Sequence, residues 1–544
     1  SLPRLPVPKL GDTLSKYLKT VQPFLNDAEF NTTSNLVKEF ESGMGQKLQS
    51  LLEKRAEQHE NWLEDWWLNT AYLEYRDPVV VFSSPGLYAA KTLLCFYNNR
   101  IEMMGKSPLD MSQYKKIFGT CRIPIEKRDK LSFNDSKHVT VIHNNHIFRV
   151  DLWGNDGKRL NEDQIAQILK KVVDSSSSTA SDAIGILTSE NRDNWAKAYQ
   201  LLNKVNRDSL LDVETSLAVL CLDGATGVWR LQDDARRTLA AAQTIHGGGS
   251  RSNGANRWFD KTIQVLESPD GITGLTYEHS PAEGQPIAVL TDFIIKEQDK
   301  PVESSSSSPK DPIRLTFNVN KEVAEMIATA KSNLDKLVAD LDLNCFKFDR
   351  YGKNFIKSHK MSPDSYLQMA MQYAFYKLHG TPGAHYESAA TRMYAGGRTE
   401  TIRSCSPESV QFARAMLDAR AAPRDKLALQ GFGVDRHLLG LKLTAIENGI
   451  ELPKIYSDPG YVRSAHMRIS TSQVACRCDG FMCYGPLVAD GYATCYNPRD
   501  DDVNFATAAF AAHPDTASAT YRAALEHALA DMHDVLLRAT QSKL

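Results

Sequence analysis

Short apolar segments typical of strands alternate with longer helical patterns along this chain, on both sides of a serine-rich segment. The expected strands of the first half are residues 139–142, 147–152, 184–187 and 218–222. The first two flank Asn144-Asn145 and predict a β-hairpin. Those of the second half are residues 467–474, 480–484, 492–496 and 503–510. The serines at 304–308, followed by Pro309 and Pro312, mark the expected boundary. Like the serines at 175–178, they predict a mobile surface loop. The pattern therefore predicts an α/β chain of two halves, each built on a mixed sheet.

Helical patterns surround these strands. Residues 61–76 are rich in tryptophan and predict a largely buried helix, in which core packing is the simpler interpretation than a ligand cage. Further helices are expected at 324–339 and 519–538. Residues 362–378 carry full boundary signals, with Ser362 as N-cap, Pro363 at the first helical position and Gly380 after the end.

Composition excludes several classes of protein. The 544 residues are 42% hydrophobic and 24% charged, which is typical of a soluble globular protein. A formal net charge of −2 argues against a nucleic-acid partner, and no segment approaches the roughly 18 apolar residues of a membrane span. The nine cysteines lack zinc-like spacing, so we expect reduced thiols and no metal.

His279 is the strongest catalytic candidate. Residues 268–271 predict a turn, and residues 272–277 predict the returning strand that ends just before it. A neutral imidazole on a rigid support is the usual biological base near pH 7. Glu283 could orient a neighbouring group or form an ion pair. With 14 histidines in the chain, a histidine without catalytic function at a loop entrance is the alternative.

A basic segment at 347–360 suggests a phosphate partner. It contains five lysine or arginine residues and His359 against a single acid, Asp349. Lysine ammonium groups suit phosphate as compact point charges. A solvated basic loop is the alternative interpretation. The chain has no Gly-x-x-x-x-Gly-Lys motif, so nothing supports ATP hydrolysis.

Seven motifs in this order resemble the choline/carnitine acyltransferase family over almost the whole chain. They lie at residues 247–249, 256–261, 276–284, 351–357, 386–389, 397–404 and 470–474, and residues 2–8 resemble the family's N-terminal signature. The resemblance implies two similarly folded domains of the CoA-dependent acyltransferase type with an active-site tunnel between them. The first domain would be residues 67–319, and the second would combine residues 1–66 with 320–544.

The resemblance also implies a role for each motif residue. His279 would be the general base, Ser472 the donor to the oxyanion, and Glu283 would hold the site through an ion pair with Arg398. The expected coenzyme A contacts are Lys353, Lys357, Asp364 and Gln473. The expected carnitine contacts are Tyr386, Ser388, Thr399, Arg436 and Ser470, with Thr401 beside them. Met482 would close the acyl pocket, and no cofactor would be tightly bound.

The implied reaction is reversible acetyl or short-chain acyl transfer between acetyl-CoA and L-carnitine. Arg436 and Thr399 suit the carboxylate of carnitine, whereas choline-acetylating members typically carry uncharged and apolar residues there. Residues 253–256 and 278–281 look more like the choline branch, so choline acetylation is the alternative. A catalytically silent coenzyme A-binding relative is a further alternative.

The C-terminal Ser542-Lys543-Leu544 predicts recognition by the peroxisomal import receptor. A second, mitochondrial location is compatible with the family, and a monomer is expected. Two stretches look shorter than the family's usual pattern, one after Pro85-Gly86 and one at residues 426–432. In the family, the second stretch normally contributes a helix and a basic residue near coenzyme A.

Overall fold

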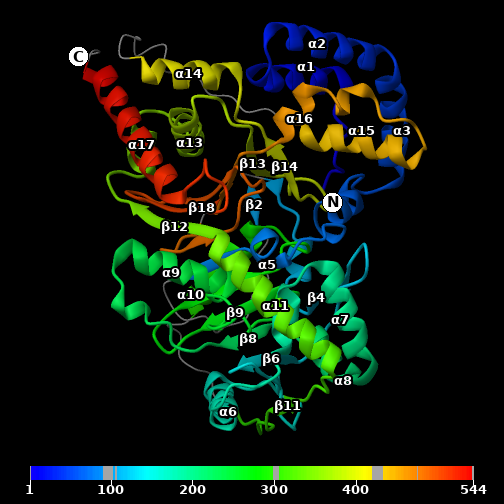
Figure 1. The fold of residues 1–544 in the computed structure, drawn as a ribbon, viewed down its shortest axis with the longest axis vertical. Helices are drawn as coiled ribbons and strands as arrows, with labels where there is room; N and C mark the ends of the chain where they lie inside the picture. The colour runs from blue at the N-terminus through cyan, green and yellow to red at the C-terminus, as the bar shows by residue number, and fades with distance from the viewer. Residues whose placement is uncertain are drawn as a thin grey trace.

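The computed structural model describes residues 2–89, 102–104, 107–297, 305–418, 433–474 and 476–541. Two large mixed sheets with flanking helices dominate the molecule (Figure 1). The predicted α/β class with two mixed sheets is therefore confirmed.

The first sheet has eight strands in the order β11–β7–β6–β8–β9–β10–β1–β16. Their bounds are Ile313–Leu315, His146–Asp151, His138–His143, Val219–Leu222, Ile263–Glu267, Thr273–Tyr277, Gly86–Ala89 and Phe481–Cys483. Strand β8 pairs in parallel with β6 and β9, and all other neighbours in this sheet are antiparallel.

The second sheet has six strands in the order β12–β18–β17–β15–β13–β14. Their bounds are Leu341–Phe348, Val503–Phe510, Tyr492–Pro498, Ile469–Gln473, His385–Ala390 and Thr399–Ile402. Strand β15 is parallel to β17 and β13, and the remaining pairs are antiparallel. Two small pairs complete the strands, β2 (Met103–Met104) with β3 (Ser107–Pro108) and β4 (Thr120–Ile123) with β5 (Lys130–Phe133).

The helices cover the sheets and build a separate N-terminal layer. Their bounds are α1 Leu10–Val21, α2 Asp27–Ser42, α3 Met44–Gln58, α4 Glu64–Leu68, α5 Val79–Phe82, α6 Glu162–Ser175, α7 Arg192–Val205, α8 Arg207–Thr215, α9 Asp233–His246, α10 Gly284–Glu297, α11 Lys321–Asp340, α12 Lys353–Ser358, α13 Pro363–His379, α14 Pro407–Leu417, α15 Asp435–Glu447, α16 Pro459–Ala465 and α17 Ser518–Gln541. Short 3₁₀ segments are η1 Gln22–Phe24, η3 Ser112–Lys116, η4 Ile184–Ser189, η5 Val228–Arg230 and η7 Lys454–Tyr456, and η2 Asn69–Leu73 is a π-helix. Among the described residues, no helix is both long and apolar enough to cross a membrane.

Both predicted hairpins are present. Strands β6 and β7 pair around Asn144 and Asn145, which have φ of 50° and 65° as a tight hairpin turn requires. Strands β9 and β10 pair around the predicted turn, where the Gly271 amide donates to the Ser268 carbonyl at 3.1 Å. The predicted boundaries of α13 are also confirmed, since the Ser362 hydroxyl accepts from the Ser365 amide and Gly380 is left-handed.

One local prediction is wrong, and another is confirmed only in part. Residues 184–187 form the buried 3₁₀ segment η4 and not a strand, because a short apolar run cannot be told from a buried helical turn by periodicity. The predicted helix at 61–76 is divided into α4 and the π-helix η2, a rare form that is frequent at functional sites.

The serine runs were expected to be mobile surface loops, but one serine in each is buried. Ser176 donates to the Val172 carbonyl at 2.6 Å, and Ser307 donates to Asp156 at 2.6 Å. Because a buried hydroxyl needs a hydrogen-bond partner, both loops are tied to the neighbouring structure.

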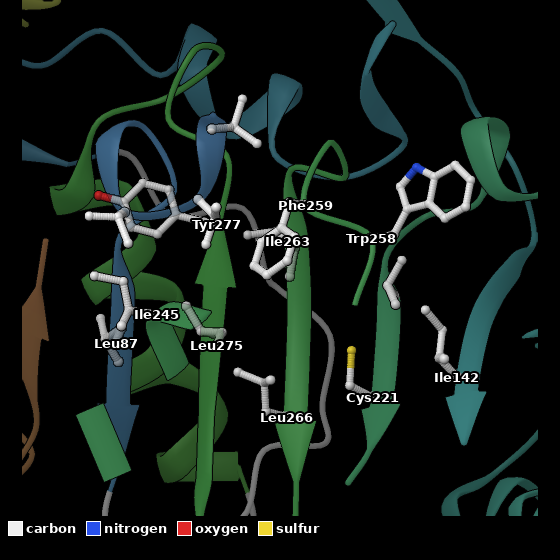
Figure 2. Close-up of a cluster of buried hydrophobic side chains, with 14 of the residues drawn as sticks. Leu87, Ile142, Cys221, Ile245, Trp258, Phe259, Ile263, Leu266, Leu275 and Tyr277 are labelled. Atoms are coloured by element: carbon white, nitrogen blue, oxygen red, sulfur yellow. The ribbon is translucent and has the colours of Figure 1, made fainter. Parts of the chain in front are cut away.

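The core of the first sheet holds the strand that leads to His279. Figure 2 shows Leu87, Leu275, Leu266, Cys221 and Ile142 on adjacent strands, with Ile263, Phe259, Trp258, Ile245 and Tyr277 packed around them. Their burial fixes the register of β10, because a one-residue slip would turn every side chain to the other face.

Strand β16 links the two halves of the chain. It follows β15 of the second sheet in sequence, but it pairs with β1 at the edge of the first sheet, with Met482 opposite Leu87. The other strands of the first sheet lie between residues 86 and 315, and those of the second between residues 341 and 510. We retain the division at residues 67–319 as a proposal, with β16 as an exchanged strand.

The N-terminal helices pack on the C-terminal half. Helices α1, α2 and α3 lie beside α15 and α16 (Figure 1), and buried side chains such as Leu14, Tyr17, Leu438 and Leu441 form their shared core. This contact carries the start of the chain to the part of the molecule that holds Arg436 on α15.

Candidate active site

His279 lies two residues beyond the end of β10 on a well-held backbone. Its amide donates to the Ser83 carbonyl at 2.9 Å, and the preceding Glu278 amide donates to the Thr262 carbonyl at 3.0 Å. These bonds extend the order of the sheet past its last residue, so the imidazole stands on a rigid support, as the sequence predicts.

Two tyrosines enclose the imidazole. The Tyr72 hydroxyl lies 2.9 Å from Nδ1, and the two rings are stacked with centroids 5.5 Å apart. The Tyr277 ring lies 5.4 Å away, centroid to centroid. Burial lowers the pKa of His279 below its ordinary value, with Glu283 acting to raise it and Arg398 to lower it. The neutral imidazole, which can accept a proton, is therefore the favoured form.

Glu283 lies between the histidine and Arg398. Its Oε2 is 3.5 Å from His279 Nε2, and Arg398 Nε donates to its Oε1 at 2.6 Å, so the expected ion pair is present. Burial raises the pKa of Glu283, but Arg398 and His279 lower it, and the result lies below the ordinary value. Arg398 also donates to the carbonyls of Ser280 at 2.6 Å and His279 at 3.1 Å, which fixes the backbone of the catalytic candidate.

The predicted carnitine contacts share one face of the second sheet. Tyr386 lies opposite Ser470 in the register of β13 and β15, and Ser388 lies opposite Thr401 of β14. Residues two apart along a strand face the same side, which adds Ser472 and Thr399 to this face. The intervening Thr471 faces away, because it contacts Gln368 of α13 and His385.

Arg436 is held against this face from the first turn of α15. Its guanidinium donates to the Thr399 carbonyl at 2.9 Å and to the Thr401 hydroxyl at 3.2 Å, and it lies 3.5 Å above the Trp67 ring centroid. The Arg436 side chain also hydrogen-bonds to Tyr386. Burial raises the pKa of Tyr386 above its ordinary value, and Arg436 offsets part of that rise. A buried cation at this position favours an anionic group of a ligand.

A chain of ring contacts joins this cation to the histidine. Trp67 lies under Arg436, the Tyr72 ring is 6.2 Å from Trp67, and the Tyr72 ring is stacked on His279. The structure therefore places the proposed base beside the predicted carboxylate pocket, although the two come from different sheets.

Sequence reasoning missed both Trp67 and Tyr72. It placed this segment in a buried helix and treated the tryptophans as core, which holds for Trp62 and Trp66. Trp67 Nε1 is buried and has no hydrogen-bond partner among the residues that the structure describes. A buried orphan donor is uncommon and suits a ligand acceptor. No signal in the sequence distinguishes it from its neighbours.

The four predicted coenzyme A contacts lie together at one end of the second sheet. Lys353 and Lys357 are one turn apart on α12, whose first residues dock on the loop after β17 through a 2.9 Å bond from the Lys353 amide to the Arg499 carbonyl. Asp364 accepts a 2.5 Å bond from the Tyr496 hydroxyl, and Gln473 lies opposite Tyr496 in the sheet. Lys353 is also 3.1 Å from Asp500.

Met482 lies beside the base from the edge strand β16. The Tyr277 hydroxyl donates to its sulfur at 3.3 Å, and a Cβ added at Gly284 would lie 3.2 Å from its terminal methyl. Met482 therefore packs against Tyr277, whose ring contacts His279, and against Gly284, which follows Glu283. The family resemblance predicts the acyl pocket at Met482.

Residues 256–261, which contribute to the family resemblance, are structural here. Arg257 forms a bidentate pair with Asp223 at 2.6 and 2.7 Å, and Lys261 donates to the carbonyls of Val213 and Glu214. Asp260 accepts from Arg192 and Trp195. All of these groups are buried.

In the described ranges, no group of three or more His, Cys, Asp or Glu side chains is placed to hold a metal ion. The predicted import signal at residues 542–544 and the shortened stretch at 426–432 lie outside the described residues.

Comparison with known proteins agrees with the motifs. The family model for choline/carnitine O-acyltransferase matches residues 5–527. Carnitine O-acetyltransferases of Columba livia and Homo sapiens are each 42% identical over 100% of this chain and 95% of their own length. Choline O-acetyltransferase of Sus scrofa is 35% identical over 98% of this chain and 92% of its own length. The chain is an acyltransferase and belongs to the choline/carnitine O-acyltransferase family.

Proposed function

We propose that this enzyme transfers an acetyl or other short acyl group reversibly between acetyl-CoA and L-carnitine. The observation that carries the proposal is Arg436, a buried cation held by Thr399 and Thr401 and joined to His279 through Trp67 and Tyr72. Carnitine carries a carboxylate, and choline does not. A carboxylate bound at Arg436 would compensate the buried charge and could accept from the orphan Trp67 N–H.

The identities support the same choice. The chain is 40–42% identical to the carnitine O-acetyltransferases and 34–35% identical to the choline O-acetyltransferases that it matches. Choline acetylation remains the second candidate because these relatives also span the chain. A silent coenzyme A-binding relative is less well supported, since His279 keeps a neutral-favouring environment and its acidic neighbour Glu283.

In the proposed mechanism, His279 takes the proton from the carnitine 3-hydroxyl, and the resulting oxygen nucleophile attacks the thioester carbonyl. In the reverse direction, His279 activates the CoA thiol. The hydroxyl of Ser472 and the substrate's own trimethylammonium group stabilise the negative oxygen of the intermediate. Collapse of that intermediate expels the CoA thiolate, which takes the proton back from His279.

The remaining predicted contacts complete the two substrate sites. Lys353, Lys357, Asp364 and Gln473 would hold coenzyme A, which acts as a co-substrate. Tyr386, Ser388 and Ser470 would line the carnitine site with Arg436 and Thr399. Met482 would limit the acyl chain.

Release of CoA from acetyl-CoA with carnitine and then with choline tests the substrate. We expect kcat/KM for carnitine to exceed that for choline by at least about 10²-fold, as for sites that lose a charged partner. A preference for choline would place the chain in the other branch.

A His279→Ala variant tests the base. General-base assistance is worth about 10²–10⁴-fold in rate, so we expect less than about a tenth of wild-type turnover with unchanged coenzyme A binding by calorimetry. His527→Ala, at an exposed position on α17, is the matched control. Substantial turnover in His279→Ala would contradict the assignment.

We further propose that Ser542-Lys543-Leu544 directs import into peroxisomes, with a second, mitochondrial form as the alternative location. We also propose that the enzyme is a monomer. Microscopy of a fusion tagged at the N-terminus, with and without the last three residues, tests the signal.

A further inference from the structure

Arg122 on strand β4 contacts both Tyr72, whose hydroxyl meets the imidazole, and Glu278, which directly precedes His279. Its side chain is buried, and its guanidinium makes three directed contacts. Nη2 donates to the Tyr72 carbonyl at 2.7 Å, Nη1 donates to Glu278 Oε1 at 3.1 Å, and Nε donates to Asp129 Oδ2 at 2.7 Å. One rigid, planar group therefore fixes the distance between the backbone of Tyr72 and the carboxylate of Glu278.

Glu278 transmits this restraint to His279. It directly precedes the histidine, and its carboxylate accepts from the Ser280 amide at 3.3 Å and from the Ser280 hydroxyl. The chain on both sides of His279 is thus fastened to one carboxylate. Arg398 fastens the carbonyls of His279 and Ser280 from the other side.

The contacts form a closed path. It runs from Arg122 to the Tyr72 carbonyl, along Tyr72 to its hydroxyl, across 2.9 Å to His279 Nδ1, and back through Glu278 to Arg122. The tautomer that leaves Nε2 unprotonated as a base carries its proton on Nδ1, where the Tyr72 oxygen can accept it. The Glu283 carboxylate, 3.5 Å from Nε2, favours the opposite tautomer, so the position of Tyr72 is what supports the basic form. A change in the position of Tyr72 would remove the preference for the tautomer that is protonated on Nδ1.

Arg122 is itself held by a buried ionic network. Asp129 also accepts from Arg192 at 2.7 Å, and Arg192 donates to Asp260 at 2.6 Å. The Arg122 amide donates to the Asp260 carbonyl at 2.8 Å. Removing one partner of such a network leaves an uncompensated charge, so a change at Arg122 lowers stability whether or not Arg122 positions the site. The test must therefore separate stability from positioning.

We propose that Arg122 is a positioning residue for the reaction, which holds Tyr72 and the His279 backbone in the relative placement that keeps Nε2 ready to accept a proton. The proposal rests on the proposed function of His279. Arg122 touches no expected substrate atom. Its contribution is the alignment of two groups that do lie in the site, and a misplacement of about 1 Å can cost about 10²-fold in rate.

Arg192 offers a matched control within the same network. It is equally buried, and in the described part of the chain its ion pairs go to Asp129 and Asp260 rather than to Glu278. Arg122→Lys and Arg192→Lys each replace a planar fork by a point charge that cannot reproduce the contacts. Both should therefore lower the melting temperature.

The experiment compares the two variants with wild type in melting temperature, kcat, KM for acetyl-CoA and the pH profile of kcat/KM. We expect Arg122→Lys to lower kcat roughly 10²-fold and Arg192→Lys to lower it less than about threefold at a similar loss of melting temperature. The titratable and charged groups that face His279 are Tyr72, Tyr277, Glu283 and Arg398. Since burial lowers the pKa of His279, loosening its enclosure in Arg122→Lys should move the acid limb to higher pH.

Equal losses of kcat in the two variants, or an acid limb that moves in neither, would overturn the positioning role and leave Arg122 as a stabilising residue. If Arg122→Lys does not fold, Glu278→Gln tests the same path, because it keeps an acceptor for Arg122 but removes the charge. A severalfold lower kcat with a moved acid limb is expected there, and an unchanged profile would overturn the proposal. An inactive wild type, or an active His279→Ala, would instead overturn the proposed function.

Discussion

At the scale of single residues, hydrogen bonds and ion pairs hold the polar side chains around His279 and restrict them to few conformations. Arg398 pairs with Glu283, Arg436 is fixed by two threonines, and Tyr72 faces Nδ1. Preorganised groups of this kind need not move during the reaction. Such preorganisation is the main source of electrostatic stabilisation of the transition state by enzymes.

The pocket around Arg436 predicts how the substrate can be exchanged. Replacing Arg436 by Asn together with Thr399→Val and Thr401→Asn removes the cation and both hydroxyls that hold it. We expect kcat/KM for carnitine to fall, because its carboxylate loses the guanidinium. That for choline should rise, because bound choline cannot neutralise a buried guanidinium and the variant has none. Both values should be measured in wild type and triple mutant, and a preference that does not move would contradict the assignment of this pocket.

At the scale of single elements, the short helix α12 presents two lysines one turn apart on the end of the second sheet. Lys353→Ala and Lys357→Ala should each weaken coenzyme A use by roughly 1.5–3 kcal/mol if the lysine meets a charged oxygen, and by less if the phosphate stays hydrated. KM for carnitine should hardly change. Dephospho-CoA is the sharper probe, because a variant and wild type that discriminate equally against it would show that this lysine does not read the 3′-phosphate.

Strand β16 brings Met482 across from the other half of the chain to the Tyr277 hydroxyl. Met482→Gly should open space beside Tyr277 and raise kcat/KM for acyl groups longer than acetyl, at little cost for acetyl. A series of acyl-CoA substrates of increasing chain length measures this. Met467→Ala, at another buried methionine, is the control. An unchanged length profile would remove Met482 from the acyl pocket.

At the scale of the whole molecule, buried neutral histidines make stability depend on pH. Burial lowers the pKa of His246 and His437 to about 4 and that of His385 to about 3. The unfolded chain therefore binds more protons than the folded chain below about pH 6.5, and this part of the free energy of unfolding falls as pH falls toward 4. One pKa unit corresponds to about 1.4 kcal/mol.

His437→Gln tests this on one group, which lies 2.7 Å from the Thr13 hydroxyl and 2.9 Å from Gln49. The free energy of unfolding of the variant should fall less between about pH 7 and about pH 5 than that of wild type, as measured by urea unfolding. The exposed His527→Gln should follow wild type. Parallel pH curves for wild type and His437→Gln would contradict the prediction.

Local patterns along the sequence determined much of the fold. The hairpin at Asn144-Asn145, the capped helix α13 and the strand that ends before His279 all follow from turn residues and periodicity within a few positions. The prediction of a strand at 184–187 is wrong because all six residues of η4, 184–189, are buried and show no alternation that would separate a strand from a helical turn.

Only the tertiary structure decided how the site is assembled. Tyr72 and His279 are 207 positions apart, and Trp67 meets Arg436 across an even longer separation. The return of β16 to the first sheet and the placement of Arg122 under both Tyr72 and Glu278 likewise join distant segments. Periodicity and turn chemistry act within one element, whereas these contacts depend on which buried faces pack together. The sequence by itself therefore determined most of the elements and the proposed base. Packing determined which residues surround that base.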